Sequence, residues 1–330
     1  MATHAGVSPG TVSNVLNHPE LVREATRDRV LASMAALGYV RNEAARHLRS
    51  GSTRTLAMIV LDAWNPFFAD VARGVEDIAV AQGWTVLLAN SHRSTEREAL
   101  YLREFAERRV AGLLVSPHAD LAASLQALRR GGIESVLLDA RASDPEGLSV
   151  SVDDVEGGRL AASHLLGLGH REIAFGGDPA TVSHVRDRLE GVRVALRDAG
   201  LPGDVSVLPA PDLTVEGGAE VGRQILGLPQ SRRPTALFAA SDLVAMGALH
   251  ELVRAGWKVP EDISIVGYDD NAFAEHVLIP LTTVRQPAYE MGRVATEMLL
   301  GRLEGRPITP NHLIFQPELV VRESTRVLDQ

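Results

Sequence analysis

The hydrophobic residues of this chain follow two different patterns, one before about residue 54 and one after it. From Thr55 onward, short continuous apolar runs alternate with amphipathic stretches. Such runs are typical of parallel β-strands that are buried on both faces between helices, so they predict a doubly wound α/β architecture. There are too many runs for one sheet, which predicts two similar lobes with a break at Ser151–Val155. The predicted strands are Leu56–Leu61, Thr85–Ala89, Gly112–Val115, Ser135–Leu138, Ile173–Phe175, Ala236–Ala239 and Ile263–Val266.

Before residue 54 the pattern is that of short helices. Val12, Val15 and Leu16 fall on one helical face. Ahead of them, Gly6 can adopt the positive φ that ends a helix, and Ser8 can cap the next one. The residues left on the polar face are Thr11, Ser13, Asn14 and Asn17. Two helices joined by a tight glycine turn, the second with a small polar outer face, are typical of a helix-turn-helix that reads DNA.

The rest of this region predicts a third helix and a connecting segment. The third helix is expected over Thr26–Leu37, closing a small core through Val30, Met34 and Leu37. Residues 41–49 are weakly helical, and a helix of eight or nine residues is marginal alone in water. Composition alone therefore favours a disordered tether over a hinge helix that orders only on DNA.

Composition excludes several classes of protein. The 330 residues include no cysteine, so disulfides and thiolate metal sites are impossible. No apolar stretch approaches the ~20 residues that span a bilayer, and no basic segment followed by an apolar core begins the chain. We therefore expect a cytoplasmic protein with no membrane partner.

The charge is unevenly distributed along the chain. Residues 1–54 hold seven arginines and four acidic residues, which gives a formal charge of +3. The whole chain carries −9, so residues 55–330 carry −12. Because an acidic surface repels phosphate, we expect only the N-terminal region to contact nucleic acid, and to do so less tightly as salt rises.

Segments along nearly the whole chain resemble the LacI family of bacterial transcription regulators, in the order that the family has them. The most specific is the helix-turn-helix run from Ala5 to Asn17. The other matching segments are Thr26–Val30, Leu37–Val40, Arg41–Leu48, Asn65–Phe68, Arg109–Gly112, Leu168–His170, Val266–Asp270 and Leu281–Pro287. The resemblance implies an all-α helix-turn-helix headpiece followed by a two-lobed, doubly wound effector domain like that of periplasmic binding proteins. It also reverses the preference for a disordered tether.

The resemblance further implies where the domains and lobes begin and end. The headpiece would span residues 1–53 with a hinge helix at about 42–49, and residues 54–330 would bind the effector and dimerise. The chain would cross between the lobes near Ser151–Asp153, Val284–Pro287 and Ile314–Pro317. Lobe 1 would then comprise about 54–152 and 287–314, and lobe 2 about 153–284 and 316–327.

For DNA, the resemblance implies a recognition helix in the major groove and a leucine wedge in the minor groove. Asn14 stands where many relatives carry arginine. Arginine favours guanine, whereas asparagine pairs bidentately with adenine, a preference of ~1–3 kcal/mol per good contact. Since Pro9 and Gly10 offer no side-chain hydrogen bonds, we expect fewer direct base contacts than in typical relatives. Arg41 replaces the usual proline at the entry to the hinge. The DNA-contacting residues are predicted to be Ser8, Pro9, Gly10, Thr11, Ser13, Asn14, Asn17, Asn42, Ala45 and Leu48.

For the effector, open α/β sheets bind ligands beyond the carboxyl ends of their strands. Polar residues at those ends are often only helix caps, but here they recur in both lobes and suit a cleft rich in acceptors. The family usually has asparagine at Ser241. The positions that match the family's effector site are Phe68, Asp139, Arg188, Ser241, Asp242, Asp269 and Gln286.

The chemistry of this set favours a sugar or sugar derivative. Carboxylates, an arginine and an apolar platform suit a polyhydroxylated ring. A purine-binding relative would be expected to carry a large aromatic residue just after Asp139, where this chain has Ala140. A regulator that answers a purine or a protein co-regulator remains an alternative.

Enzyme motifs are incomplete. Gly167-Leu168-Gly169 begins like a dinucleotide fingerprint, but Glu172 occupies the third glycine position. There is no Gly-Lys-Ser/Thr phosphate loop, no Gly-x-Ser-x-Gly elbow and no histidine spacing typical of a metal site. We expect no enzyme, cofactor or metal. The alternative from another class, a periplasmic-type sugar-binding protein, would need a secretion signal and no DNA-reading head.

The two ends of the chain carry further expectations. Met1–Ala5 matches only the last part of the family's first helix, so we expect the true start to lie upstream and this chain to bind DNA weakly. No leucine heptad follows Val320–Thr325, which predicts a homodimer rather than a tetramer. Two protomers would place two recognition helices on a pseudo-palindromic operator.

Overall fold

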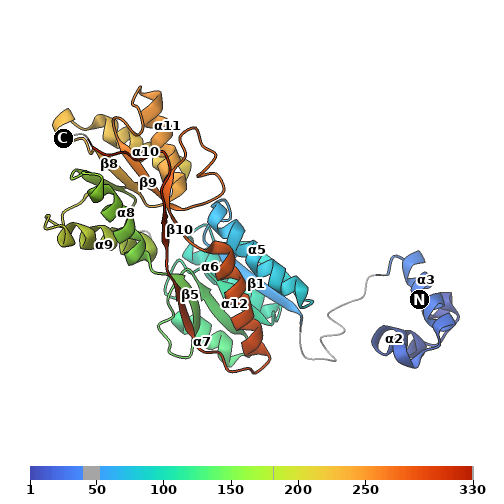
Figure 1. The fold of residues 1–330 in the computed structure, drawn as a ribbon. Coiled ribbons are helices and arrows are strands. Elements are labelled where there is room, and N and C mark those ends of the chain that lie inside the picture. Colours follow the sequence, from blue (N-terminus) through green and yellow to red (C-terminus); the bar gives the residue numbers. More distant parts are fainter. Residues whose placement is uncertain (40–52, 181, 329–330) are drawn as a thin grey trace. The chain divides into compact units, whose positions relative to one another are not determined.

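The computed structural model describes residues 1–39, 53–180 and 182–328 (Figure 1). The chain divides into two units, Met1–Thr53 and Arg54–Gln330. The predicted hinge helix, with Arg41, Asn42, Ala45 and Leu48, lies outside the described residues.

The N-terminal unit is a small helical domain. Its buried core consists of Ala5, Val12, Val15 and Val30. The prediction that Leu37 closes this core is wrong: its exposed fraction is 49%, because the third helix ends at Ala36 and Leu37 leaves its apolar stripe. The elements of this unit are α1 (Ala2–Ala5), α2 (Pro9–Asn17), the 3-10 turn η1 (Pro19–Leu21) and α3 (Glu24–Ala36).

The predicted turn between the first two helices is confirmed. Gly6 ends α1 with a φ of 62°, the left-handed conformation that glycine adopts without steric cost. Ser8 Oγ accepts a hydrogen bond from the backbone N–H of Thr11 at 3.1 Å and so caps α2. Pro9 is the first residue of α2, where its missing N–H is not needed.

The second unit contains two six-stranded sheets, which we call the sheets of lobe 1 and lobe 2 (Figure 1). Every pairing in them is parallel except that of β10 with β12. The lobe 1 sheet has the order β11 (His312–Phe315), β5 (Leu148–Val152), β4 (Glu134–Leu138), β3 (Gly112–Val115), β1 (Thr55–Val60), β2 (Thr85–Asn90). The lobe 2 sheet has the order β12 (Glu318–Val320), β10 (Thr282–Arg285), β9 (Ser264–Asp269), β8 (Ala236–Ala239), β6 (Ile173–Gly176), β7 (Ser206–Leu208).

Strand β1 shows why continuous apolar runs predicted this fold. Leu56 and Met58 pack into one hydrophobic cluster, and Ala57 and Ile59 pack into another on the opposite face. All four are fully buried, as expected for a central parallel strand. All seven strands predicted from the apolar runs are confirmed.

Helices cover both faces of each sheet, and the chain passes between the lobes three times. The passages fall between β5 and α8, between β10 and α12, and between β11 and β12. No helix within the described residues is both long and apolar enough to cross a membrane. The helices of lobe 1 are α5 (Pro66–Ala81), α6 (Thr95–Glu107), α7 (Ala122–Arg130) and α12 (Ala288–Leu303). Those of lobe 2 are α8 (Asp154–Gly167), α9 (Ser183–Asp198), α10 (Val215–Gly227), η2 (Gln230–Arg232) and α11 (Asp242–Arg254).

Reciprocal glycines let neighbouring helices approach closely. Between α8 and α9, a Cβ on Gly158 would overlap the carbonyl oxygen of Arg188, and one on Gly191 would overlap that of Val155. The pairs α5–α12 and α10–α11 have the same arrangement, through Gly74 with Gly292 and Gly218 with Gly247. The close contact between α8 and α9 thereby sets the position of Arg188, which belongs to α9.

We expect Gly158→Ala to lower the free energy of unfolding by about 2–3 kcal/mol, because the new methyl group forces α8 and α9 apart. Urea unfolding of the full chain measures this effect. Gly167→Ala, at the end of the same helix with nothing near its Cβ position, is the matched control and should be neutral or stabilising by about 0.5–1 kcal/mol. Equal losses in the two variants would show that the close approach does not matter.

Candidate functional site

The outer face of α2 is a polar surface. Pro9, Gly10 and Asn14 are exposed along it, whereas Val12 and Val15 face the core. Among the other residues predicted to contact DNA, Ser8 and Asn17 are exposed and Thr11 and Ser13 are half-buried.

The polar side chains of α2 hydrogen-bond to one another. The hydroxyls of Ser8 and Thr11 lie 2.9 Å apart, and Asn17 Nδ2 donates to the carbonyl oxygen of Ser13 at 2.9 Å. Sequence reasoning did not anticipate these bonds. They hold the side chains in place, and contact with a base would have to replace them.

In the second unit, six of the seven residues predicted for the effector line one small space between the lobes, which we call the central cavity. Its volume is about 20 Å³, room for about one water molecule. The six are Phe68, Asp139, Arg188, Ser241, Asp269 and Gln286. They are joined by Leu61, Asn65, Phe67, Arg93, Val182, His184 and Leu213.

The seventh predicted residue, Asp242, does not line the central cavity. Its carboxylate accepts hydrogen bonds from the Thr283 hydroxyl at 2.6 Å and from the backbone N–H of Asn271 at 2.9 Å. Burial, followed by the nearby Asp269, raises its pKa well above the ordinary range. Asp242 therefore ties α11 to the ends of β9 and β10, and both of its oxygens are occupied.

Arg188 occupies the lobe 2 side of the cavity and is almost completely buried. Its Nε donates to Asp154 Oδ1 at 2.8 Å, and its Nη1 donates to the carbonyl oxygen of Ala240 at 2.6 Å. The guanidinium carbon lies 3.6 Å from the centre of the Tyr268 ring. Sequence reasoning missed Asp154 and Tyr268. Arg188 thus neutralises buried carboxylates while it faces the cavity.

Three buried oxygen atoms at the cavity have no hydrogen-bond partner among the described residues. They belong to Asp139 (Oδ1), Asp269 (Oδ2) and Gln286 (Oε1). Asp269 is held by its other oxygen, which accepts from Gln286 Nε2 at 2.7 Å. Because a buried polar atom without a partner costs free energy, these acceptors favour a ligand that carries several hydrogen-bond donors.

The ionisation of the two aspartates reflects their burial. Burial raises the pKa of Asp139 well above its ordinary range, with Asp154 adding to the effect. Burial also raises the pKa of Asp269 to about 6, although the nearby Arg188 opposes the rise. At pH 7 Asp269 is therefore largely ionised and accepts strong hydrogen bonds.

Backbone strain is concentrated at the same place. Arg93, Asp139 and Asp269 all line the cavity and have φ values of 54°, 54° and 116°, in the region that favours glycine. Non-glycine residues in this region cost of order 1–3 kcal/mol each and gather at functional sites.

Two contacts join the lobes beside the cavity. Arg93 of lobe 1 donates to Asp212 of lobe 2 at 2.8 Å and also pairs with Asp62 of its own lobe at 3.3 Å. Asp139 of lobe 1 lies 3.5 Å from the Nδ1 atom of His184 on α9. Burial, together with Arg188 and Arg93, lowers the pKa of His184 well below its ordinary value, so this second contact is polar rather than ionic at pH 7. Sequence reasoning missed Arg93, Asp212 and His184.

A helix-turn-helix unit joined to a two-lobed domain with buried acceptors in its cleft defines a DNA-binding regulator that responds to a small ligand. A family model described as "Bacterial regulatory proteins, lacI family" matches residues 1–42, and one described as "Periplasmic binding protein-like domain" matches residues 162–325. The chain is 36% identical to the HTH-type transcriptional repressor PurR of Aliivibrio fischeri (strain MJ11), over 98% of this chain and 96% of that protein. The chain belongs to the LacI family, as the resemblance implied.

Two solved structures show the same fold over nearly the whole chain. One is the complex of the transcriptional regulator CelR with cellobiose, with a TM-score of 0.74, 34% identity and coverage of 98% of both chains. The other is the lac repressor dimer bound to its operator and the anti-inducer ONPF, with a TM-score of 0.84, 27% identity and coverage of 98% of this chain and 97% of that one. The predicted fold class, a helix-turn-helix headpiece followed by a two-lobed effector domain, is confirmed.

Proposed function

We propose that this protein is a cytoplasmic repressor of carbohydrate-utilisation genes that binds a pseudo-palindromic operator as a homodimer. A sugar-like effector that binds between the lobes lowers its affinity for the operator. The observation that carries the proposal is the convergence of unpartnered, buried oxygens from both lobes on the central cavity.

A sugar fits these acceptors better than a purine does. A sugar ring presents hydroxyl donors around its edge, which match the oxygens of Asp139, Asp269 and Gln286. The aromatic residues at the cavity, Phe67 and Phe68, both come from α5 and pack edge to face with their ring centres 5.1 Å apart. They offer an apolar wall on one side, and the third aromatic ring at the cavity is the small imidazole of His184 on α9. The CelR complex contains a sugar in the same fold.

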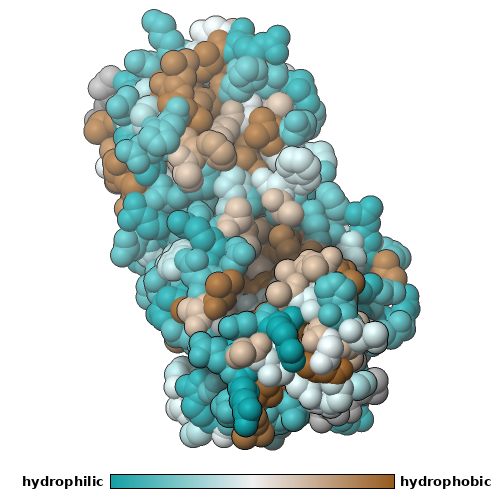
Figure 2. Space-filling view, turned by 90° about the vertical axis from the view of Figure 1, so that its right-hand side faces the viewer, coloured by the Kyte–Doolittle hydropathy of each residue, from teal (hydrophilic) through white to brown (hydrophobic). Residues whose placement is uncertain are grey.

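Exposed apolar side chains support a homodimer. On lobe 2, the upper part of Figure 2, hydrophobic residues gather between hydrophilic ones. Leu278 and Phe273 there have exposed fractions of 88% and 57%, and Trp64 on lobe 1 has 82%. Leu87 and Leu88 are exposed on β2, the edge strand of the lobe 1 sheet. Exposed apolar residues that gather on one face are typical of an interface, and the gathering on lobe 2 supports one there.

The link to DNA runs through the hinge. In the proposed complex α2 enters the major groove, while Asn42, Ala45 and Leu48 contact the minor groove from paired hinge helices. Effector binding changes how the lobes meet, because the cavity is bordered by the Arg93–Asp212 ion pair that joins them. A coupling free energy of ~1–3 kcal/mol suffices for useful control.

Two binding experiments test this proposal. Selection of sites from a random duplex pool should yield a sequence with two inverted half-sites, bound more tightly than random competitor. Thermal unfolding with a panel of sugars should then identify at least one that raises the melting temperature by mass action. Selection of no palindrome, or stabilisation by purines and not by sugars, would overturn the proposal.

A further inference from the structure

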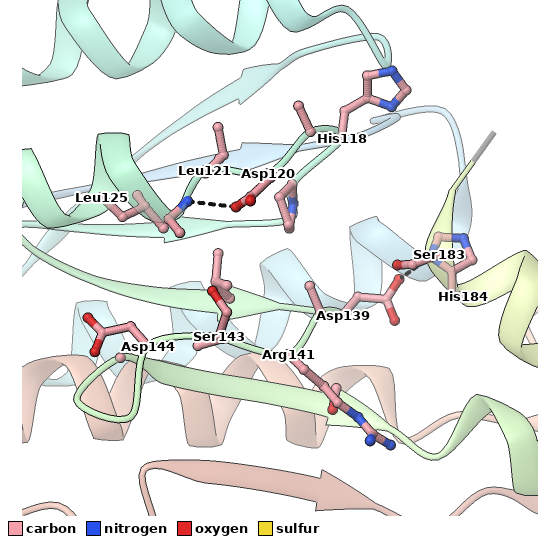
Figure 3. Close-up of a pocket in the computed structure, with 18 of the residues that line it drawn as sticks. His118, Asp120, Leu121, Leu125, Asp139, Arg141, Ser143, Asp144, Ser183 and His184 are labelled. Carbon is pink, nitrogen blue, oxygen red and sulfur yellow. Dashed lines mark hydrogen bonds and ion pairs between the residues drawn. The ribbon is translucent and has the colours of Figure 1, made fainter. Parts of the chain in front are cut away.

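A second and much larger space opens beside the central cavity, on the lobe 1 side (Figure 3). We call it the side chamber; its volume is about 650 Å³. One wall carries Asp120, Leu121 and Leu125 from the start of α7, and the facing wall carries Ser143 from the loop after β4. The two spaces meet at Asp139, Val182 and His184, which line both of them.

The side chamber lies between α7 with the loop before it on one side and the loop after β4 on the other. No side chain of α7 is fully buried, in contrast to every other helix of the lobe 1 sheet. Buried Glu98 on α6 holds the loop before α7 by accepting from the backbone N–H of His118 at 2.8 Å. Arg129 on α7 pairs with Asp144 in the loop after β4. Arg129 thus ties the two walls together at one end, while Glu98 ties the loop before α7 to α6.

Volume decides where the bulk of a ligand can lie. Pockets for small molecules typically measure about 300–1,000 Å³, and the side chamber falls within that range whereas the central cavity does not. A ligand can therefore lie mainly in the side chamber, donate a hydrogen bond to Asp139, and place only one of its edges in the central cavity.

The lining of the side chamber indicates a neutral, hydroxylated ligand. Three residues that line it hold buried polar atoms without a hydrogen-bond partner among the described residues: Asp139 (Oδ1), Ser151 (Oγ) and His118 (Nδ1). Of the seven acidic residues that line it, Asp139 has a pKa raised by burial and Asp154 is paired with Arg188. The other five still outnumber the three arginines of the lining, so a phosphorylated or otherwise anionic ligand would be repelled. The aromatic rings that line it are the imidazoles of His118 and His184, and no larger aromatic side chain of the described residues offers a platform for a nucleobase.

We propose that the effector is an unphosphorylated oligosaccharide of at least two sugar units. One unit contacts the acceptors of the central cavity at Asp139, and the next lies in the side chamber between α7 and the loop after β4. This inference rests on the proposed function and adds to it the length and charge of the effector.

Neighbouring alanines at the start of α7 provide a matched test. Ala122 lines the side chamber and Ala123 does not, so Ala122→Trp fills the space while Ala123→Trp adds the same bulk outside it. Calorimetry on the full chain would compare glucose, galactose and ribose with cellobiose, maltose, lactose and cellotriose, and with glucose 6-phosphate and cytidine. We expect one of the oligosaccharides to bind at least 10-fold tighter than its component monosaccharide. Ala122→Trp should weaken that binding at least 10-fold and change monosaccharide binding less than 2-fold, and Ala123→Trp should behave as wild type.

The outcomes separate the two proposals. If a monosaccharide or its phosphate binds as tightly as any oligosaccharide, or if Ala122→Trp binds the oligosaccharide normally, the two-site inference is wrong while the sugar-responsive repressor stands. If cytidine binds and no sugar does, both are wrong. Should Ala122→Trp fail to fold, Ser143→Trp on the opposite, exposed wall obstructs the same space and carries the same expectations.

Discussion

Replacing Arg188 by alanine is expected to lower the free energy of unfolding of the effector-binding domain by about 3–5 kcal/mol. The change leaves Asp154 buried without its cation and removes the ring contact with Tyr268. It also removes the hydrogen bond that Arg188 donates to the carbonyl oxygen of Ala240. Losing one partner of a buried ion pair costs more than losing both, because the remaining charge has no compensation.

Urea unfolding monitored by circular dichroism measures this loss. Arg186→Ala is the matched control, since Arg186 lies half a turn away on α9, is exposed and should be within about 0.5 kcal/mol of wild type. Adding Asp154→Asn to Arg188→Ala should recover part of the loss by removing the uncompensated charge. A loss from Arg188→Ala no greater than that from Arg186→Ala would contradict the role given to this pair.

Asp269→Asn is expected to stabilise the domain and at the same time to abolish most of its response to effector. Burial raises the pKa of Asp269 from 3.8 to about 6, so between these values the folded chain holds a proton that the unfolded chain has lost. Stability from this group is therefore present below about pH 4 and is lost as the pH rises to 6. Asparagine does not ionise, so the variant should gain about 3 kcal/mol at pH 7.5 and almost nothing at pH 4.

The same variant should bind effector about 10–100-fold more weakly, because hydrogen bonds to a charged acceptor contribute about 1.5–3 kcal/mol. Unfolding at several pH values and calorimetry at pH 7.5 measure the two effects separately. Asp204→Asn, at an exposed position, serves as the control and should change neither quantity. A variant that is less stable than wild type at pH 7.5, or that binds effector normally, would show that Asp269 is a structural residue.

The sequence predicted strands well where the run of residues was continuously apolar, and less well where the run was short or interrupted by polar residues. The seven apolar runs all became strands. It missed β5, whose sequence Leu-Ser-Val-Ser-Val alternates polar and apolar residues although all five are buried. It also missed β7 and β12, which are three residues long, and β10 and β11, which are four residues long. Strands of this kind are defined by their neighbours in the sheet rather than by their own residues.

The site shows a similar division between local and tertiary information. Strand ends and family resemblance located Asp139, Asp269 and Gln286, because the carboxyl ends of parallel strands meet at one edge. They could not show that Asp242 turns toward Thr283, since that depends on how α11 packs. They also could not reveal the side chamber, because its volume depends on how the loop after β4 packs against α7, where Arg129 pairs with Asp144.

The central claim is that effector binding in the cleft controls the affinity of the headpiece for operator DNA. Fluorescence anisotropy of a labelled operator tests this claim most directly. The operator is titrated with the full-length wild type and with Asp269→Asn, each with and without a sugar effector at a concentration that saturates the wild type. We predict that the effector lowers operator affinity of the wild type by 5–150-fold, whereas Asp269→Asn needs about 10–100-fold more effector for the same loss. An effector that binds the cleft of the wild type yet leaves its operator affinity unchanged would contradict the claim.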